Sequence, residues 1–118
     1  MVRSFLGEMS TEPREIGVRR EEGTALGNLG IAYQALGQVE EAIGFYEQAL
    51  AIAQEIGDRR GEGIRCWNLG EIYEESDPAR AVELMSVLVA FEREIGHPEA
   101  ETHAERVAEI ETCIDDPD

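Results

Sequence analysis

Apolar residues recur at intervals of three and four along two stretches of the chain, which is the spacing of one helix face. The first series ends at Gly37 and the second at Gly57. The first comprises Leu26, Leu29, Tyr33 and Leu36, and the second comprises Ala42, Ile43, Tyr46, Ala49, Leu50 and Ala53. Because glycine commonly ends a helix, the pattern predicts two antiparallel helices joined by a very short turn.

This helical pair occurs twice along the chain. When residues 14–37 are placed over residues 54–77, matching residues coincide at a constant offset of 40. The second copy then loses one residue in its turn, and the offset becomes 39. The clearest matches are Asn28-Leu29-Gly30 with Asn68-Leu69-Gly70, Tyr33 with Tyr73, and Glu55-Ile56-Gly57 with Glu94-Ile95-Gly96. A helical pair repeated at a fixed period predicts a helical-repeat protein.

The repeated residues resemble the tetratricopeptide repeat family, whose pattern is W-x2-L-G-x2-Y followed by A-x3-F. The first copy has Leu26-x2-Leu29-Gly30-x2-Tyr33 and Ala42-x3-Tyr46, and the second has Cys66-x2-Leu69-Gly70-x2-Tyr73 and Ala81-x3-Met85. The small residues of this pattern, glycine and alanine, allow two helix backbones to approach closely. The period of 40 residues resembles that of a subclass with slightly longer helices. The resemblance covers residues 14–96 and implies an all-α, short right-handed superhelical solenoid of antiparallel helix pairs.

The length of 118 residues suits a single domain built from these repeats. Its expected parts are a degenerate half repeat at 1–18, repeats at 19–57 and 58–96, a capping helix at 97–114 and an acidic tail at 115–118. Pro13 falls on Ala53 of the intact copy, in a helix interior where proline is costly. Residues 1–12 are therefore expected to be loosely held or ordered by another chain, although Pro13 can also begin a short helix.

A capping helix is predicted because residues that favour the end of one helix are followed by residues that favour the start of another. Gly96 suits the end of one helix, and Pro98 suits the first turn of the next. One side of the new helix then carries Ala100, His103, Ala104, Val107, Ile110 and Ile114. Glutamates occupy the other side, and a terminal repeat needs such a polar outer face.

The chain is strongly acidic, with 10 arginines, no lysine and 26 acidic residues, for a formal net charge of −16. Such a chain repels phosphates and anionic lipids, so nucleic acids and membrane surfaces are poor partners. Two interpretations of the charge remain open, a well-solvated surface and a preference for basic partners. Arg59, Arg60 and Arg65 form the one local concentration of positive charge, and they can bind a ligand or pair with neighbouring glutamates.

The compartment is expected to be the cytoplasm. No apolar run approaches the roughly 20 residues of a membrane span. Met1 to Ser10 lacks the apolar core of a secretory signal. Cys66 and Cys113 lie far apart without metal-binding spacing, which is typical of a reducing environment.

The sequence predicts no enzyme, no cofactor and no metal site. Gly23, Gly27 and Gly30 match a glycine-rich spacing, but they lie within a helical stripe and not after a strand. His97 and His103 are six residues apart, so they do not share a helix face as paired zinc ligands would.

The family resemblance implies a protein-binding role, in which the first helix of each repeat lines a concave groove. Asn28 and Asn68 then stand where an amide can donate to and accept from an extended peptide backbone. The candidate groove residues are Asn28, Ile31, Gln34, Trp67, Asn68, Glu71, Glu74 and Glu75. Two interpretations of Trp67 remain open, an anchor for a peptide and a packing residue between repeats. The acidic groove favours a neutral or basic peptide.

An alternative function is self-association as a structural scaffold, in the form of a homodimer or larger homo-oligomer. The segment from Ala81 to Phe91 has nine apolar residues among eleven, and a helix apolar nearly all round is buried nearly all round. Either the capping helix alone covers it or a second subunit does. The candidate self-association residues are Phe5, Leu84, Leu88 and Phe91.

Overall fold

The structure, a computed structural model, describes residues 14–115 of the chain. The predictions made for Phe5, for residues 1–12, for a helix start at Pro13 and for the last three residues lie outside this range. The helices of these described residues are α2 (Arg14–Ala35), α3 (Val39–Ile56), α4 (Arg59–Tyr73), α5 (Pro78–Ile95) and α6 (Ala100–Asp115). Residues 14–115 contain no strand, and the predicted all-α helical-repeat solenoid is confirmed.

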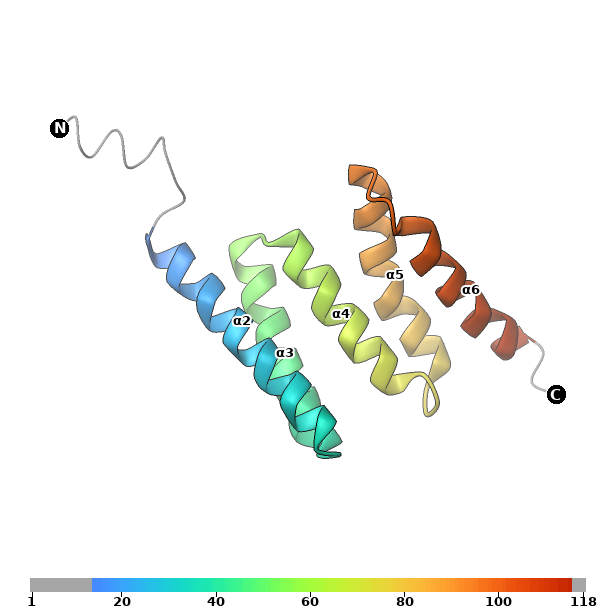
Figure 1. Ribbon diagram of the computed structural model, residues 1–118, viewed down its shortest axis with the longest axis horizontal. Helices are drawn as coiled ribbons and strands as arrows, with labels where there is room; N and C mark the ends of the chain where they lie inside the picture. The colour runs from blue at the N-terminus through green and yellow to red at the C-terminus, as the bar shows by residue number, and fades with distance from the viewer. Residues whose placement is uncertain (1–13, 116–118) are drawn as a thin grey trace.

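The helices follow one another across the molecule in the order of the sequence (Figure 1). The closest packing joins α2 to α3 and α4 to α5, which are the two predicted helical pairs. Less extensive contacts join α3 to α4 and α5 to α6. The helices α2, α4 and α6 share one orientation in Figure 1.

Glycines end the helices at the predicted places. Gly37, Gly57 and Gly96 have φ angles of 81°, 73° and 70°, in the left-handed region where a side chain would be strained. Aspartates cap the starts of two helices: the Asp58 carboxylate at α4 accepts a hydrogen bond from the Gly61 N–H at 2.9 Å, and Asp77 caps α5 in the same way. The predicted short turns therefore follow from local sequence alone.

Close approach within each pair occurs where the sequence carries glycine. A Cβ atom placed at Gly30 would lie 2.6 Å from Cε1 of Tyr46. A Cβ atom at Gly70 would likewise overlap the side chain of Met85. Tyr46 and Met85 are the largest fully buried side chains in the described part of the chain. The glycines of α2 and α4 thus make room for the large core residues of α3 and α5.

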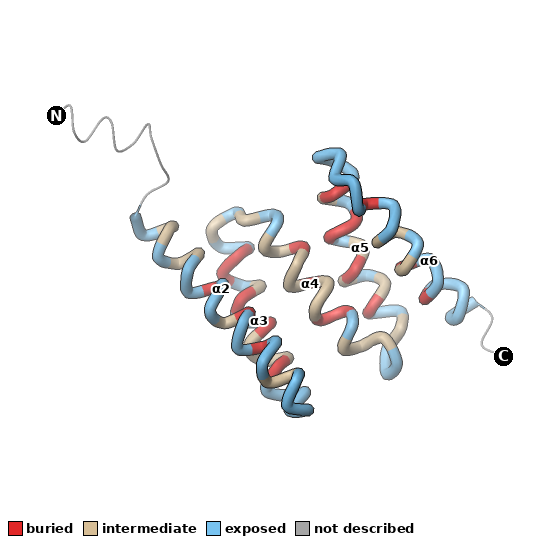
Figure 2. Tube along the Cα trace, viewed as in Figure 1, coloured by how far each residue is buried: buried red, intermediate tan, exposed pale blue. Residues whose placement is uncertain are grey.

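The core consists of successive layers between helices and has no single centre, as the buried segments in Figure 2 show. One cluster joins α3 to α4 through Ala42, Tyr46 and Leu69. The second joins α5 to α6 through Ala81, Met85, Val89, Val107 and Ile110. This second cluster attaches the predicted capping helix to the repeats.

Equivalent leucines differ in burial. Leu69 is 3 % exposed because it packs against Ala42 and Tyr46, which belong to the pair that precedes α4. Leu29 occupies the same repeat position in α2 and is 43 % exposed. Within residues 14–115 no helix precedes α2 to cover it. One side of α2 therefore remains apolar and open.

Candidate functional site

The first helices of the repeats form one continuous surface through direct side-chain contacts. Arg65 of α4 lies over Gly27 of α2, so close that a Cβ atom at Gly27 would lie 2.6 Å from Nε of Arg65. The Arg106 guanidinium of α6 pairs with the carboxylate of Glu74, the residue that caps the end of α4. The predicted groove residues come from α2, from α4 and from the turn that follows α4.

None of the eight candidate groove residues is buried. The exposed ones are Asn28, Ile31, Glu71 and Glu75, and the half-buried ones are Gln34, Trp67, Asn68 and Glu74. The structure thus leaves each of them some access to solvent. Their part in binding a peptide stays a prediction.

The polar groups on this surface are partly engaged by the chain itself. The Tyr46 hydroxyl donates a hydrogen bond to Oε1 of Gln34 at 2.8 Å. Nη1 of Arg65 donates to Oδ1 of Asn68 at 3.1 Å. The amide nitrogens of Gln34 and Asn68 have no acceptor within residues 14–115, so they can donate to a peptide carbonyl.

Burial changes the acidity of two groups beneath this surface. Removal from water lowers the pKa of the Arg65 guanidinium and raises the pKa of the Tyr46 phenol. Neither change alters the charge at neutral pH, so Arg65 remains a cation. In the described part of the chain, no carboxylate lies within ion-pair distance of Arg65.

Trp67 packs against the cluster that joins α5 to α6. Its ring centroid lies 4.7 Å from that of His103 in α6. This position favours the interpretation of Trp67 as a packing residue between repeats. Because Trp67 is half-buried, part of its ring is still accessible.

Charge is distributed unevenly along the surface. Toward the ends of α4 and α6 lie Glu71, Glu75 and Glu109, all exposed. Arg106 partly offsets them, and its hydrogen bond to Glu74 raises the pKa of the Arg106 guanidinium. Near the start of α4, Arg60 and Arg65 lie together with Asp58 and Glu62. The surface is therefore mainly acidic at one end and mixed in charge at the other.

Two other arginines, Arg19 of α2 and Arg59 of α4, are paired with carboxylates at equivalent places. Arg19 pairs with Glu55 at 2.6 Å, and Arg59 pairs with Glu94 at 2.6 Å. The two pairs are related by the repeat offsets of 40 and 39. Each arginine holds the pKa of its glutamate below the usual range. Such exposed pairs contribute little to stability. Their main interest is that they show the same contact at equivalent positions of the two repeats.

The candidate self-association residues lie mostly against their own chain. Leu88 is 7 % exposed, and Leu84 packs against the cluster that joins α3 to α4. Phe91 is half-buried, and the Arg59 guanidinium lies 5.3 Å from its ring centroid. A more accessible apolar surface lies on α2, where Val18 and Leu29 are exposed, and it continues to Leu36 just after this helix. Self-association stays a prediction.

The sequence did not lead us to predict that Glu92 would be buried. Glu92 follows the apolar segment of α5 and is only 5 % exposed. Its Oε1 lies 2.6 Å from Nδ1 of His103. The repeat alignment could have indicated that Glu92 is buried, because Glu92 aligns with Ala53, which lies on the apolar face of the equivalent helix in the first copy.

Two kinds of reactive group were sought among the described residues, nucleophilic thiols and clusters of metal ligands. Burial raises the pKa of the Cys66 thiol to about 11, so the thiol stays protonated at neutral pH and is a poor nucleophile. Residues 14–115 hold no group of three or more metal-ligating side chains. Nor does any described helix have the length and apolar character needed to cross a membrane.

Comparison with protein-family models matches residues 21–91 to the tetratricopeptide repeat. Comparisons with curated proteins and with solved structures find no match. Tetratricopeptide repeats generally mediate protein–protein interactions and are typically non-catalytic. The matched region spans more than half of the 118 residues and covers most of both helical pairs. The chain therefore belongs to the tetratricopeptide repeat family.

Proposed function

We propose that the protein is an interaction module that binds an extended peptide, or an extended segment of a partner protein, across α2, α4 and α6. The observation that carries the proposal is the pair Asn28 and Asn68. They occupy equivalent places in the two repeats, and neither is buried. An amide can pair with the peptide backbone whatever the peptide sequence, so two amides one repeat apart suit an extended strand.

The proposed partner is neutral or basic over most of its length. Glu71, Glu75 and Glu109 attract positive charge at one end of the surface, and added salt should weaken that attraction. We further propose a cytoplasmic location, because Cys66 and Cys113 are both free thiols. Nucleic acid and membrane surfaces remain poor partners for a chain of net charge −16.

The test is the double substitution Asn28→Ala with Asn68→Ala. Peptides selected from a library by the unaltered protein should bind the double variant about fivefold to tenfold more weakly, because each lost hydrogen bond is worth about 1 kcal/mol or less in water. Isothermal titration calorimetry measures the affinity, and urea unfolding should show a loss of no more than about 1 kcal/mol, the worth of the hydrogen bond from Arg65 to Asn68.

The matched control is Gln48→Ala, which removes an exposed amide from α3, outside the proposed surface. It should leave every affinity unchanged. Equal binding of all selected peptides by the double variant and the unaltered protein would refute the proposed groove.

A second candidate function is self-association through α2, and the exposure of Leu29 favours it. Its equivalent Leu69 is buried by the neighbouring repeat, and a second copy of the chain can cover Leu29 in the same way. Light scattering across a hundredfold concentration range should then give at least a dimer mass. Leu29→Glu should reduce that mass to the monomer, whereas Ile31→Glu, on another side of α2, should not. A monomer at every concentration of the unaltered protein would exclude this candidate.

A further inference from the structure

A pocket of about 190 Å³ lies between the first half of α4, the end of α5 and the start of α6. Its walls are mainly apolar, and charged or titratable groups stand around them. The lining residues are Arg60, Ile64, Leu88, Phe91, Glu92, Ile95, His97 and His103. For scale, a dry apolar cavity of about 150 Å³ can hold a benzene-sized group. The α4–α6 pocket therefore has room for a branched aliphatic side chain.

The first repeat has an equivalent pocket, which is nearly filled. It has a volume of about 30 Å³, roughly the space of one water molecule. The repeat offsets of 40 and 39 relate the two linings, which include Arg20 and Arg60, Thr24 and Ile64, Ile52 and Phe91, Ile56 and Ile95, and Asp58 and His97. The same junction is thus almost closed in one repeat and open in the next.

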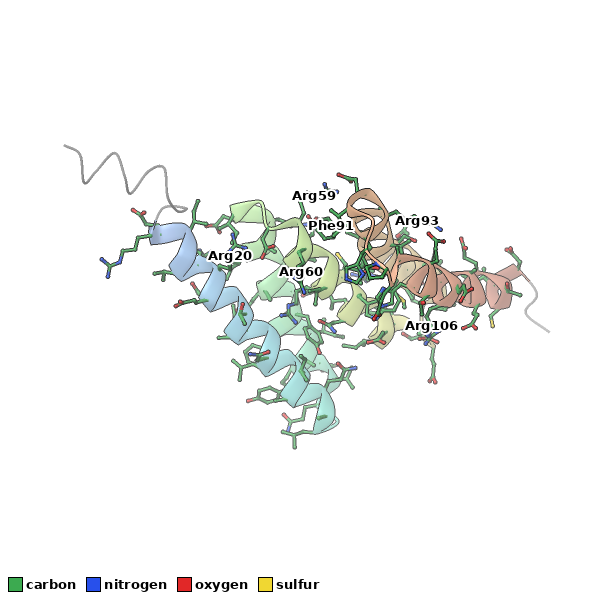
Figure 3. The ribbon with its side chains drawn as sticks, turned by 45° about the horizontal axis from the view of Figure 1, so that its top comes forward. Arg20, Arg59, Arg60, Phe91, Arg93 and Arg106 are labelled. Carbon is green, nitrogen blue, oxygen red and sulfur yellow. The ribbon has the colours of Figure 1, made fainter. Side chains whose placement is uncertain are left out.

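The two junctions also differ in charge. In the first, Nη1 of Arg20 lies 2.9 Å from Oδ2 of Asp58. In the second, His97 replaces that aspartate, and Arg60 has no carboxylate within ion-pair distance among residues 14–115. Figure 3 shows Arg20 on α2 and Arg60 on α4, with Arg59 and Phe91 nearby. Arg60 therefore lacks the carboxylate that its counterpart has.

The buried carboxylate that lines the pocket, Glu92, already contacts two histidines. Its Oε1 lies 2.6 Å from Nδ1 of His103, and its Oε2 lies 3.8 Å from Nδ1 of His97. His103 in turn packs against the ring of Trp67. Glu92 thus stabilises the wall of the pocket and leaves Arg60 available to an anion from outside the chain.

We infer that the α4–α6 pocket binds an acidic side chain of a partner peptide together with an adjacent aliphatic residue. The carboxylate takes the place that Asp58 occupies in the first repeat and pairs with Arg60. The aliphatic side chain fills the space against Ile64, Phe91 and Ile95. This inference rests on the proposed function, because the pocket lies one helical turn from Asn68. It adds an acidic position to a ligand that is otherwise neutral or basic.

The probe is a hexapeptide with blocked ends that carries a leucine-aspartate pair between glycine and serine residues. It is titrated into the full chain and followed by the fluorescence of Trp67, the sole tryptophan, and by amide NMR shifts. We expect shifts at residues that line the pocket. Replacing the peptide's aspartate with asparagine, or its leucine with alanine, should weaken binding at least fivefold.

The decisive variant is Arg60→Gln. It should weaken binding of the aspartate peptide about fivefold to tenfold and leave the asparagine peptide unaffected. The matched control is Arg19→Gln, because Arg19 makes the equivalent ion pair with Glu55 in the first repeat and does not line the pocket, so it should not matter. Ile64→Ala, on the apolar wall, should weaken both peptides alike.

Equal affinity for the aspartate and asparagine peptides, or no effect of Arg60→Gln, would overturn the inference. So would binding that depends on a free C-terminal carboxylate in an unblocked peptide and not on the aspartate. If peptides sensitive to the Asn28 and Asn68 substitutions bind but need no acidic–aliphatic pair, the pocket inference fails while the proposed function stands. If no peptide responds to those substitutions, the proposed function fails.

Discussion

Replacing Tyr46 with alanine is expected to lower the free energy of unfolding by about 3–5 kcal/mol. The side chain is 1 % exposed and packs with Ala42 and Leu69, so it links α3 to α4. Gly30, which lies against the ring, has no side chain that could fill the resulting cavity. Since small domains are stable by only about 5–15 kcal/mol, the variant should be close to unfolding. Urea unfolding followed by circular dichroism measures the change.

The control is Tyr46→Phe, which keeps the ring and removes the hydroxyl that bonds to Gln34. It should cost only about 0.5–1.5 kcal/mol. A loss below about 1 kcal/mol for the alanine variant would contradict the packing described for the junction between the repeats.

Alanine at Gly30 and alanine at Gly44 should change stability in opposite directions. Both glycines lie within helices, and both variants gain up to about 1 kcal/mol from the better helix propensity of alanine. At Gly44 a Cβ atom meets nothing within 4 Å, so that gain should be seen in full.

At Gly30 the new Cβ atom would meet three carbons of the Tyr46 ring, at 2.6, 2.7 and 3.1 Å. The buried ring cannot turn aside, so we expect an overpacking cost near the upper end of about 1–3 kcal/mol. The difference between the two variants in urea unfolding should therefore approach about 3 kcal/mol. Equal stabilities for the two variants would show that α2 and α3 are less closely packed than described.

The helices and their turns could be predicted because local sequence determines them. Gly37, Gly57 and Gly96 end helices through their own backbone conformation, whatever surrounds them. The close approach at Gly30 and Gly70 also follows from the pattern, because a repeat places these glycines opposite a large side chain. The fold could therefore be predicted from the periodicity of the apolar residues and from the positions of a few glycines.

The properties of the candidate binding surface were harder to predict from the sequence, because they depend on contacts between residues far apart in the chain. Leu29 and Leu69 share the same local sequence, yet Leu29 is exposed and Leu69 is buried, because within residues 14–115 only Leu69 has a repeat packed before it. The bond from Arg65 to Asn68 and the pair of Glu92 with His103 likewise need three-dimensional neighbours. The repeat alignment does show that His97 replaces Asp58, but only the structure shows that Asp58 pairs with Arg20 and that no other carboxylate of residues 14–115 pairs with Arg60.

The packing of each helix mainly against its neighbours in sequence has a consequence for the kinetics of folding. Contacts between consecutive helices close only short loops, and proteins of such low contact order fold within about microseconds to milliseconds. In a repeat array, stability is approximately a sum of terms for each unit and each interface. Structure can then form at either helical pair and spread to the next. Formation of the interface around Tyr46 and Leu69 is then the step that couples the folding of the α2–α3 pair to that of the α4–α5 pair.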